Sequence, residues 1–270
     1  MNTASVEAEK IENDALRSLH GVADKTLTEN LGLRMVSLGD TTISIASALP
    51  ASAITINRTL GFGRSPEQAF RDTKTAVGLY RQAGVERFFV QPSPNLQANQ
   101  TDSQFRQSGL KPARAWQKFS RSASEPVSEI NTEFNILAVD QQHCESFAEI
   151  VCDAFDLGSQ AVPWLAKLPE AKGWHAFMAF LGDAPAGCGA LYVDGDAAYT
   201  DFGATSPKFR SRGVQSSLLS HRVSSAIEMG AKRLYTCTGV AVPGDPQHSY
   251  ANILKNGFSE THARDNWQPA

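Results

Sequence analysis

A short stretch of the chain, PKFRSRGVQSSLL (207–219), sets a glycine between a basic loop and a segment with the apolar spacing of an amphipathic helix. The first turn of a helix leaves backbone N–H groups unpaired and carries about half a positive charge, so a loop that ends there attracts anions. The stretch contains a glycine that lets the ligand approach, two cations and two hydroxyl donors, namely Gly213, Arg210, Arg212, Ser216 and Ser217. Together they favour a pyrophosphate over a single carboxylate.

Other phosphate-binding classes do not fit the sequence. The lysine and the following Ser or Thr of the P-loop are absent, and neither half of the chain contains G-x-G-x-x-G. A formal charge of −3 and a pI near 6.1 disfavour a nucleic-acid partner, because no global basic field exists. Four cysteines without C-x-x-C pairs predict free thiols, and an acidic N-terminal segment without a long apolar run predicts a cytoplasmic protein without membrane contact.

The elements that must position this loop follow from the pattern of the second half. Residues 144–155 have helical apolar spacing, and residues 175–205 alternate β-rich runs with Gly-Asp and Asp-Gly-Asp turns. A helix from Val214 to Ile227 then leads to the strand KRLYTCT (232–238), which must return as a crossover connection. The sequence therefore predicts a mixed, mostly antiparallel sheet with helices packed on it, an α/β (α+β) fold.

The two halves of the chain resemble each other. Residues 80–94 are similar to 226–240, and 105–117 are similar to 253–268, at offsets of 146 and 148 residues. A nearly constant offset indicates a tandem repeat of one domain. A Ser/Pro/Glu-rich stretch between the halves predicts domains at 1–122 and 130–270 with a linker at 123–129. In the first half we expect a strand at 53–63, a helix from 65 capped by Ser65 with Pro66 at its first position, and a strand at 87–91.

This order of elements resembles the GNAT family of acetyl-coenzyme A dependent N-acetyltransferases, whose phosphate loop is written [RQ]-x-x-G-x-[GA]. Arg210, Gly213 and Gln215 occupy its three fixed places, with glutamine where glycine or alanine is usual. The segment SYANILKNGF (249–258) also fits the family's ending. The resemblance covers residues 130–270. The first half offers Arg64 but lacks the loop, so it is expected to be a degenerate GNAT-like copy that binds no coenzyme.

The resemblance implies where acetyl-CoA would bind. Its pyrophosphate would lie over the N–H groups of residues 212–217, and its pantetheine arm would pair with the strand edge at 203–205. Ser249 and Asn252 would touch the pantetheine amide, although a helix cap is an alternative role for Ser249. A solvated pair is the alternative for the two arginines. The coenzyme-binding residues implied are Gly203, Ala204, Thr205, Arg210, Arg212, Gly213, Val214, Gln215, Ser216, Ser217, Ser249 and Asn252.

The resemblance also suggests which groups take part in proton transfer. An amine attacks a thioester only when neutral, so a nearby general base would help. Family members often place a glutamate that acts as this base where Tyr199 stands in this sequence. Asp201, on the same strand face, is therefore the candidate base. A solvent-facing acid is its alternative role. Ile253 replaces the tyrosine that often protonates the leaving thiolate, so Tyr250, one turn earlier, is the candidate acid, with a buried aromatic as the alternative. Backbone N–H groups near Ala204 would stabilise the oxyanion.

The sequence therefore predicts an N-acetyltransferase that moves an acetyl group from acetyl-CoA to a primary amine, on a small molecule or a peptide, by direct attack in the C-terminal domain. Two alternatives remain. One is a non-catalytic acyl-CoA sensor or scaffold, favoured by the missing tyrosine and by Gln215. The other is an unrelated α/β domain with a fortuitous anion loop. No metal is expected, because the histidines lack ligand spacing, and the oligomeric state stays open.

Overall fold

The computed structural model describes residues 3–62, 65–94, 96, 98–127 and 130–270, and these form two compact units. Unit 1 comprises residues 1–117 together with 262–270, and unit 2 comprises residues 118–261. The predicted domains, 1–122 and 130–270, stay a prediction; the packing differs from them mainly by grouping the last nine residues with unit 1. Arg64 and the final two residues of the predicted linker, 128 and 129, lie outside the described residues.

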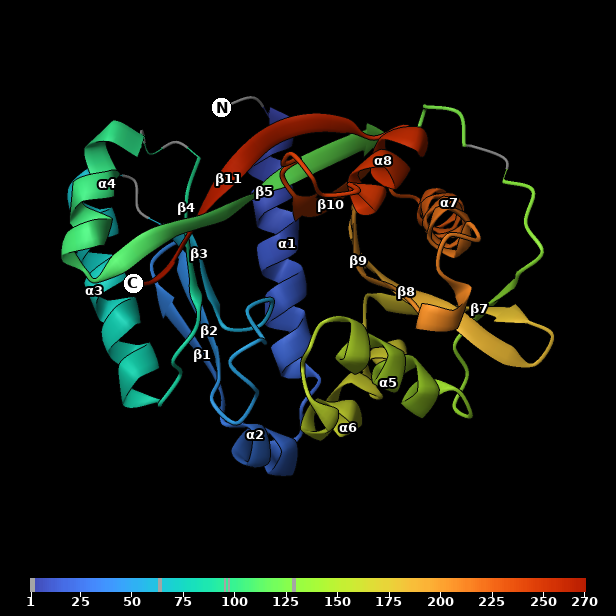
Figure 1. Cartoon of the computed structure of the whole chain (residues 1–270), viewed down its shortest axis with the longest axis horizontal. Helices are drawn as coiled ribbons and strands as arrows, with labels where there is room; N and C mark the ends of the chain where they lie inside the picture. Colours follow the sequence, from blue (N-terminus) through green and yellow to red (C-terminus); the bar gives the residue numbers. More distant parts are fainter. Residues whose placement is uncertain (1–2, 63–64, 95, 97, 128–129) are drawn as a thin grey trace. The chain divides into compact units, whose positions relative to one another are not determined.

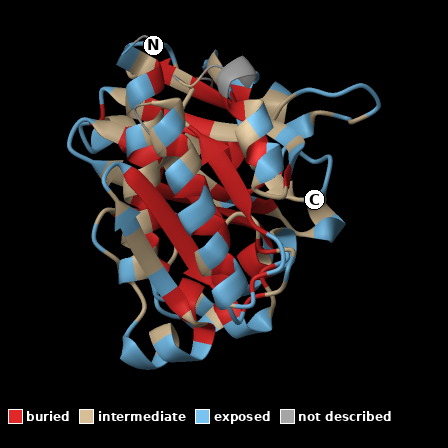
Figure 2. Cartoon of the chain, turned by 90° about the vertical axis from the view of Figure 1, so that its left-hand side faces the viewer, coloured by how far each residue is buried: buried red, intermediate tan, exposed pale blue. Residues whose placement is uncertain are grey.

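Unit 1 has two helices, three antiparallel strands, a helix, a parallel strand, a helix and a long strand (Figure 1). Figure 2 shows buried strands, in red, behind helices that keep exposed faces. Ser65 caps the third helix by accepting the Gln68 N–H at 3.3 Å, with Pro66 at the first position as predicted. The elements are α1 (Thr3–Gly21), α2 (Lys25–Leu31), β1 (Leu33–Leu38), β2 (Thr41–Ala46), β3 (Arg58–Phe62), α3 (Pro66–Gln82), β4 (Phe89–Pro92), α4 (Ala98–Gln107) and β5 (Leu110–Ser122).

Two details of unit 1 differ from the sequence-based expectation. β3 begins at Arg58 rather than at residue 53, because residues 53–57 form turns in which the Asn57 N–H bonds the Ala53 carbonyl. Gly63, the predicted end of this strand, lies outside the described residues. The elements before β3 and after β4 were not predicted, namely α1, α2, β1, β2, α4 and β5. Within the described part of the chain, no helix combines the length and apolar character needed to cross a membrane.

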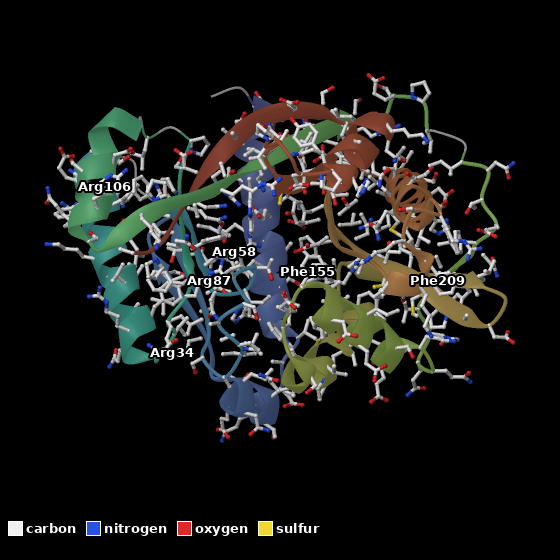
Figure 3. The ribbon with its side chains drawn as sticks, viewed as in Figure 1. Arg34, Arg58, Arg87, Arg106, Phe155 and Phe209 are labelled. Atoms are coloured by element: carbon white, nitrogen blue, oxygen red, sulfur yellow. The ribbon has the colours of Figure 1, made fainter. Side chains whose placement is uncertain are left out.

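Residues 262–270 belong to unit 1 because their side chains complete its interior. Arg264 is buried and bonds Glu12 and Glu9 on α1, and Glu12 also pairs with Arg58, which Figure 3 labels. Trp267 packs on Phe105 with ring centroids 5.1 Å apart. These contacts hold the end of β11 (Ser259–Pro269) beside β4 in unit 1.

Unit 2 has the same order of elements as unit 1 once the short strand β6 is set aside. Strands β6 to β9 pair antiparallel in sequence order, and β10 pairs parallel with β9. The predicted meander and crossover helix are thus confirmed. The elements are β6 (Asn135–Ala138), α5 (Cys144–Ala154), α6 (Val162–Leu165), β7 (Trp174–Leu181), β8 (Ala184–Asp194), β9 (Ala197–Thr205), α7 (Val214–Glu228), β10 (Arg233–Gly239) and α8 (His248–Lys255), followed by the start of β11.

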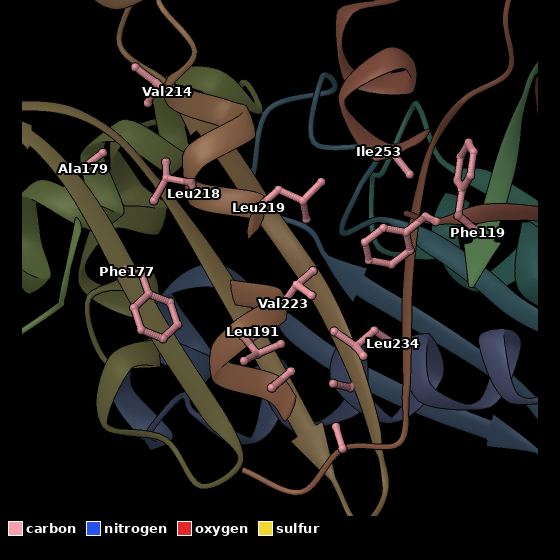
Figure 4. Packing of buried hydrophobic residues seen from close by; sticks show 14 of the residues in the cluster. Phe119, Phe177, Ala179, Leu191, Val214, Leu218, Leu219, Val223, Leu234 and Ile253 are labelled. Carbon is pink, nitrogen blue, oxygen red and sulfur yellow. The ribbon is translucent and has the colours of Figure 1, made fainter. Parts of the chain in front are cut away.

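The core of unit 2 lies where α7 packs on the sheet (Figure 4). One face of α7 buries Val214, Leu218, Leu219 and Val223, as the apolar spacing predicts, whereas Ile227 is only partly buried. Each fully buried aliphatic side chain contributes about 1.5–3 kcal/mol, so this face fixes the helix firmly on β7, β8 and β9. The start of α7 is therefore held at one place relative to these strands.

Candidate functional site

The N-terminus of α7 is open to an anion. Gly213 is its N-cap residue, with a φ of 86° that disfavours other residues, and no side chain caps the helix. The first turn of α7 contains no acidic residue. Unpaired N–H groups and the helix dipole therefore act without a competing carboxylate in that turn.

The two arginines of the loop lie in different surroundings. Arg210 is exposed. Arg212 donates from Nε and Nη2 to Glu133 at 3.0 and 2.7 Å, and its guanidinium lies over the rings of Phe134 and Phe209, the latter labelled in Figure 3. An anion at this helix end would compete with Glu133 for Arg212. Glu133 lies 79 residues away in sequence, so no local pattern could reveal it.

Gln215 connects α7 to the end of β9. Its Nε2 donates to the Thr205 hydroxyl at 3.0 Å. A Cβ atom added to Gly203 would lie 2.8 Å from the Gln215 Oε1, so this amide covers the glycine closely. The structure thus brings Gly203, Thr205 and Gln215 together, and it shows that the unusual glutamine of the loop occupies the surface of β9.

The two serines of α7 have different partners. Ser216 is buried and donates to the Asn252 Oδ1 at 2.8 Å, which joins two predicted coenzyme-binding residues across α7 and α8. Ser217 donates back to the Gly213 carbonyl at 3.2 Å. Ser249 lies inside α8, whose N-cap residue is Gln247, so the alternative role of Ser249 as the cap is wrong.

β9 has an open edge beyond its middle. In the described residues its parallel ladder with β10 ends at the pair Tyr199 and Tyr235. On its other side the register with β8 shifts by one residue, so that Phe202 and Gly203 face Gly189 as a β-bulge. The φ of Phe202 is 49°, an unusual value for an aromatic residue. Gly203 in the bulge is exposed, and Ala204 and Thr205 follow the bulge.

Asp201, the candidate base, lies directly before the bulge and is half-buried. Its Oδ1 accepts the Phe202 N–H at 2.8 Å, which fixes the carboxylate at the position where β9 changes direction. Tyr199, two residues earlier, is buried, and its hydroxyl lies 3.0 Å from the Cys237 Sγ. The sequence did not reveal this contact.

The hydroxyl of Tyr250, the candidate acid, donates a hydrogen bond to Glu260. Burial raises its pKa, and the hydrogen bond and charge of Glu260 add to the effect, giving a value of about 12. The ring packs edge-on against Phe119 with centroids 5.0 Å apart. The phenol is therefore protonated at neutral pH, and Glu260 is a partner that the sequence-based argument missed.

Comparison with known proteins finds similarity to a family over part of the chain. Residues 142–252 match the family model described as Acetyltransferase (GNAT) family. No curated protein matches the sequence significantly. Among solved structures, a GCN5-related N-acetyltransferase from Kribbella flavida has a TM-score of 0.64 at 13% identity, covering 97% of this chain and 95% of its own.

Two further structures are similar over most of their length. A functionally unknown conserved protein from Staphylococcus epidermidis has a TM-score of 0.60 at 10% identity, covering 92% of this chain and 98% of its own. A tandem GNAT protein from the clavulanic acid biosynthesis pathway has a TM-score of 0.56 at 13% identity, covering 79% and 74%. The mixed α/β fold predicted from the sequence is thus confirmed. Residues 142–252 are thus similar to the GNAT acetyltransferase family, and the chain has the fold of solved GNAT proteins.

Proposed function

We propose that the protein is an acetyl-CoA dependent N-acetyltransferase whose transfer site lies in unit 2. The observation that carries the proposal is a juxtaposition: the uncapped N-terminus of α7 is tied by Gln215 and Thr205 to the open edge of β9. The helix end suits a pyrophosphate, and the strand edge suits an extended chain with amide groups. Acetyl-CoA carries both groups and supplies an activated acetyl thioester.

The residues of unit 2 fit the coenzyme by position. N–H groups of residues 212–216 would bind the pyrophosphate, with charge from Arg210, whereas the Ser217 N–H already bonds the Gly213 carbonyl at 3.0 Å. The edge at 203–205 would pair with the pantetheine arm. Asn252, held by Ser216, would orient an amide of that arm. Because the Gln215 amide lies close over Gly203, this amide would itself contact the pantetheine arm.

The chain's own groups account for the proton movements of amine acylation. Asp201 would take a proton from the attacking amine, because its carboxylate stands on β9 directly before the bulge, where Oδ1 accepts the Phe202 N–H and fixes its position. Backbone N–H groups near Ala204 would stabilise the developing oxyanion. Tyr250, with its raised pKa of about 12, would stabilise the leaving thiolate by turning its hydroxyl hydrogen bond from Glu260 to the sulfur, as a donor that keeps its proton.

The acceptor that we propose is a primary amine on a small molecule or a peptide, in a cytoplasmic setting. A second candidate function, a non-catalytic acyl-CoA sensor, is favoured by the engagement of Tyr250 with Glu260. Both functions require coenzyme binding. Turnover of an amine separates them.

The experiment that tests the proposal compares the binding of acetyl-CoA, CoA and ADP by thermal shift and calorimetry. A ligand at about 100 times its Kd adds about 2.7 kcal/mol, which raises the Tm by several degrees. Reversal of the exposed charge in Arg210→Glu should weaken binding of CoA and acetyl-CoA about tenfold. Lys232→Glu, an exposed change beyond the other end of α7, is the matched control and should bind normally.

A panel of primary amines with acetyl-CoA then tests turnover. Acetylation of at least one amine is the expected result. Equal binding of ADP and CoA, or no binding of either, would contradict the proposed function. Binding without turnover would favour the sensor.

A further inference from the structure

Arg222 is a buried cation in the middle of α7. Only 3% of its surface is exposed, and each of its hydrogen bonds goes to a backbone carbonyl. Its Nε donates to Leu218 at 3.1 Å, on its own helix, whereas its Nη1 donates to Ala190 at 3.1 Å and to Asp201 at 2.9 Å. The guanidinium therefore links α7 to both β8 and β9 where these two strands fall out of register.

The bulge is shaped around this guanidinium. A Cβ atom at Gly189, the residue opposite the bulge, would lie 2.6 Å from the Arg222 Cζ. A Cβ atom at Gly203, in the bulge itself, would lie 3.3 Å from the Arg222 Nη2. Glycine at both positions leaves the space that the guanidinium fills. Any side chain at Gly189 would have to displace it.

A buried arginine is a costly way to fill this space. Burial lowers the pKa of Arg222 to about 10, and electrostatic interaction with Cys188 and Asp201 opposes the shift, so the group stays charged at neutral pH. An apolar side chain of similar size often stabilises an interior better than a buried charge does. Packing alone therefore does not explain an arginine here. What an apolar side chain could not do is bond the carbonyls on both sides of the bulge.

We propose that Arg222 is a positioning residue for acyl transfer: its guanidinium fixes the bulge at Phe202 and Gly203 and thereby the segment of β9 that receives the acetyl group. The bulge is where β9 turns from its paired half to its open edge. Asp201 is held on one side of it, through its own carbonyl, and Ala204 follows on the other. This inference rests on the proposed function, since the segment matters only if a thioester lies there.

The experiment compares three variants with the wild-type chain. Arg222→Met removes the carbonyl bonds, Arg222→Lys keeps the charge and one donor group, and Gly189→Ala keeps the arginine but pushes the guanidinium out of place. Val223→Ala is the matched control, because it removes buried methyl groups from the next position of the same helix without touching the bulge. The readouts are kcat and KM, Tm, and the ratio of affinities for acetyl-CoA and CoA.

We expect the variants to lower the rate of acetyl transfer and to leave coenzyme binding nearly unchanged. In Arg222→Met and Gly189→Ala, kcat should fall about tenfold or more, in line with loss of a well-placed oxyanion donor, while KM for acetyl-CoA changes less than about threefold. Any preference for acetyl-CoA over CoA should disappear, since only the acetyl group meets the bulge. Arg222→Lys should recover part of kcat, and Val223→Ala should lower the Tm with kcat nearly unchanged.

Two outcomes would overturn the inference. Folded Arg222 and Gly189 variants with wild-type kcat and acetyl-CoA preference would show that the guanidinium only packs the interior. Failure of all three variants to fold, with Val223→Ala folded, would show that it supports the fold rather than the site. Failure of the proposed function is distinguishable, because the wild-type chain itself would then neither bind acetyl-CoA nor acylate an amine.

Discussion

The carboxylate of Asp201 occupies the point at which β9 stops pairing with β10 and enters the bulge. Its Oδ1 accepts the next backbone N–H, and its carbonyl accepts from Arg222. An asparagine at this position has the same shape and keeps an oxygen for the Phe202 N–H. Substitution by asparagine therefore removes the charge and the basicity and leaves the backbone in place.

Asp201→Asn should reduce kcat about a hundredfold or more, because a general base typically contributes that much, and should leave the Kd for CoA within about twofold. Steady-state acetylation and calorimetry measure the two effects. Asp194→Asn, an exposed change at the other end of the β8 and β9 hairpin, serves as the control and should keep full activity. Unchanged turnover in Asp201→Asn would remove this residue from the mechanism.

At the scale of single residues, sequence reasoning reached the groups that are adjacent in the chain and missed their distant partners. The loop residues Arg210 and Gly213 stand where the pattern puts them, at the start of α7. The bond from Arg212 to Glu133 depends on tertiary contact. Arg222 carried a readable signal, since it stands four residues after Leu218 and four before Ala226 on the apolar face. A charge in such a stripe must be buried or distort the helix.

At the scale of elements, α1 shows how a helix can hold a titratable group in a partly buried position. His20, in its last turn, has its Nε2 2.8 Å from the Ser44 hydroxyl on β2. Burial lowers the pKa of His20 from 6.5 to about 4. The folded state therefore resists protonation of this imidazole, whereas the unfolded chain accepts the proton near pH 6.5.

The depressed pKa predicts an acid-labile contribution to stability. Above pH 6.5 His20 is neutral in both states and the folded state keeps its full stability. As the pH falls from 6.5 towards 4, protonation of His20 in the unfolded chain lowers the free energy of unfolding by up to about 3 kcal/mol. His20→Gln should reduce the dependence of unfolding free energy on pH in this window, because glutamine can bond the serine without titrating. Urea unfolding at pH 7, 5.5 and 4.5 measures the difference. Parallel curves for both proteins would contradict the assignment.

In unit 2, α5, β7 to β9, α7 and β10 were predictable because each has a clear period or turn, whereas β6 and α6 were not predicted. α7 follows from its apolar stripe, and β10 follows from the short connection after it. The bulge in β9 was not predictable, since it arises where Gly189 admits the guanidinium of Arg222 and pairing shifts by one residue. The strand predicted at 53–63 was too long, because β-propensity does not show that residues 53–57 bond among themselves.

At the scale of the whole molecule, the two units share an order of elements but differ at the corresponding helix start. In unit 2, the N-terminus of α7 has no side-chain cap and no acid in its first turn. In unit 1, Ser65 already accepts a hydrogen bond from the first turn of α3, and Glu67 adds a negative charge there. These differences support the proposal that unit 1 is a degenerate copy without a coenzyme site.

Calorimetry with acetyl-CoA should therefore give a stoichiometry of about one per chain. An anion approaching α3 meets the Glu67 carboxylate, which repels it, whereas the start of α7 attracts it. Arg210→Glu should weaken this single binding event, and Glu67→Gln should leave it unchanged. A stoichiometry near two would contradict the difference between the units.

The internal similarity of the sequence predicts two units with one order of elements, yet it could not show which strands each terminal strand pairs with. Similar strands such as β5 and β11 carry similar apolar patterns, so periodicity does not distinguish their partners. The structure makes the distinction through particular contacts. Ala123 bonds the Lys232 carbonyl in unit 2, and Trp267 pairs with Val90 in unit 1.

The return of residues 262–270 to unit 1 sets an order of events during synthesis. Residues 1–117 leave the ribosome first, but Arg264 and Trp267 follow only after the 144 residues from 118 to 261. At 5–20 residues per second, that interval is roughly 7 to 29 seconds. Throughout it, Glu12 lacks Arg264 and the core around Phe105 lacks its tryptophan. The half of the protein that is made first is thus the half that a late truncation would damage.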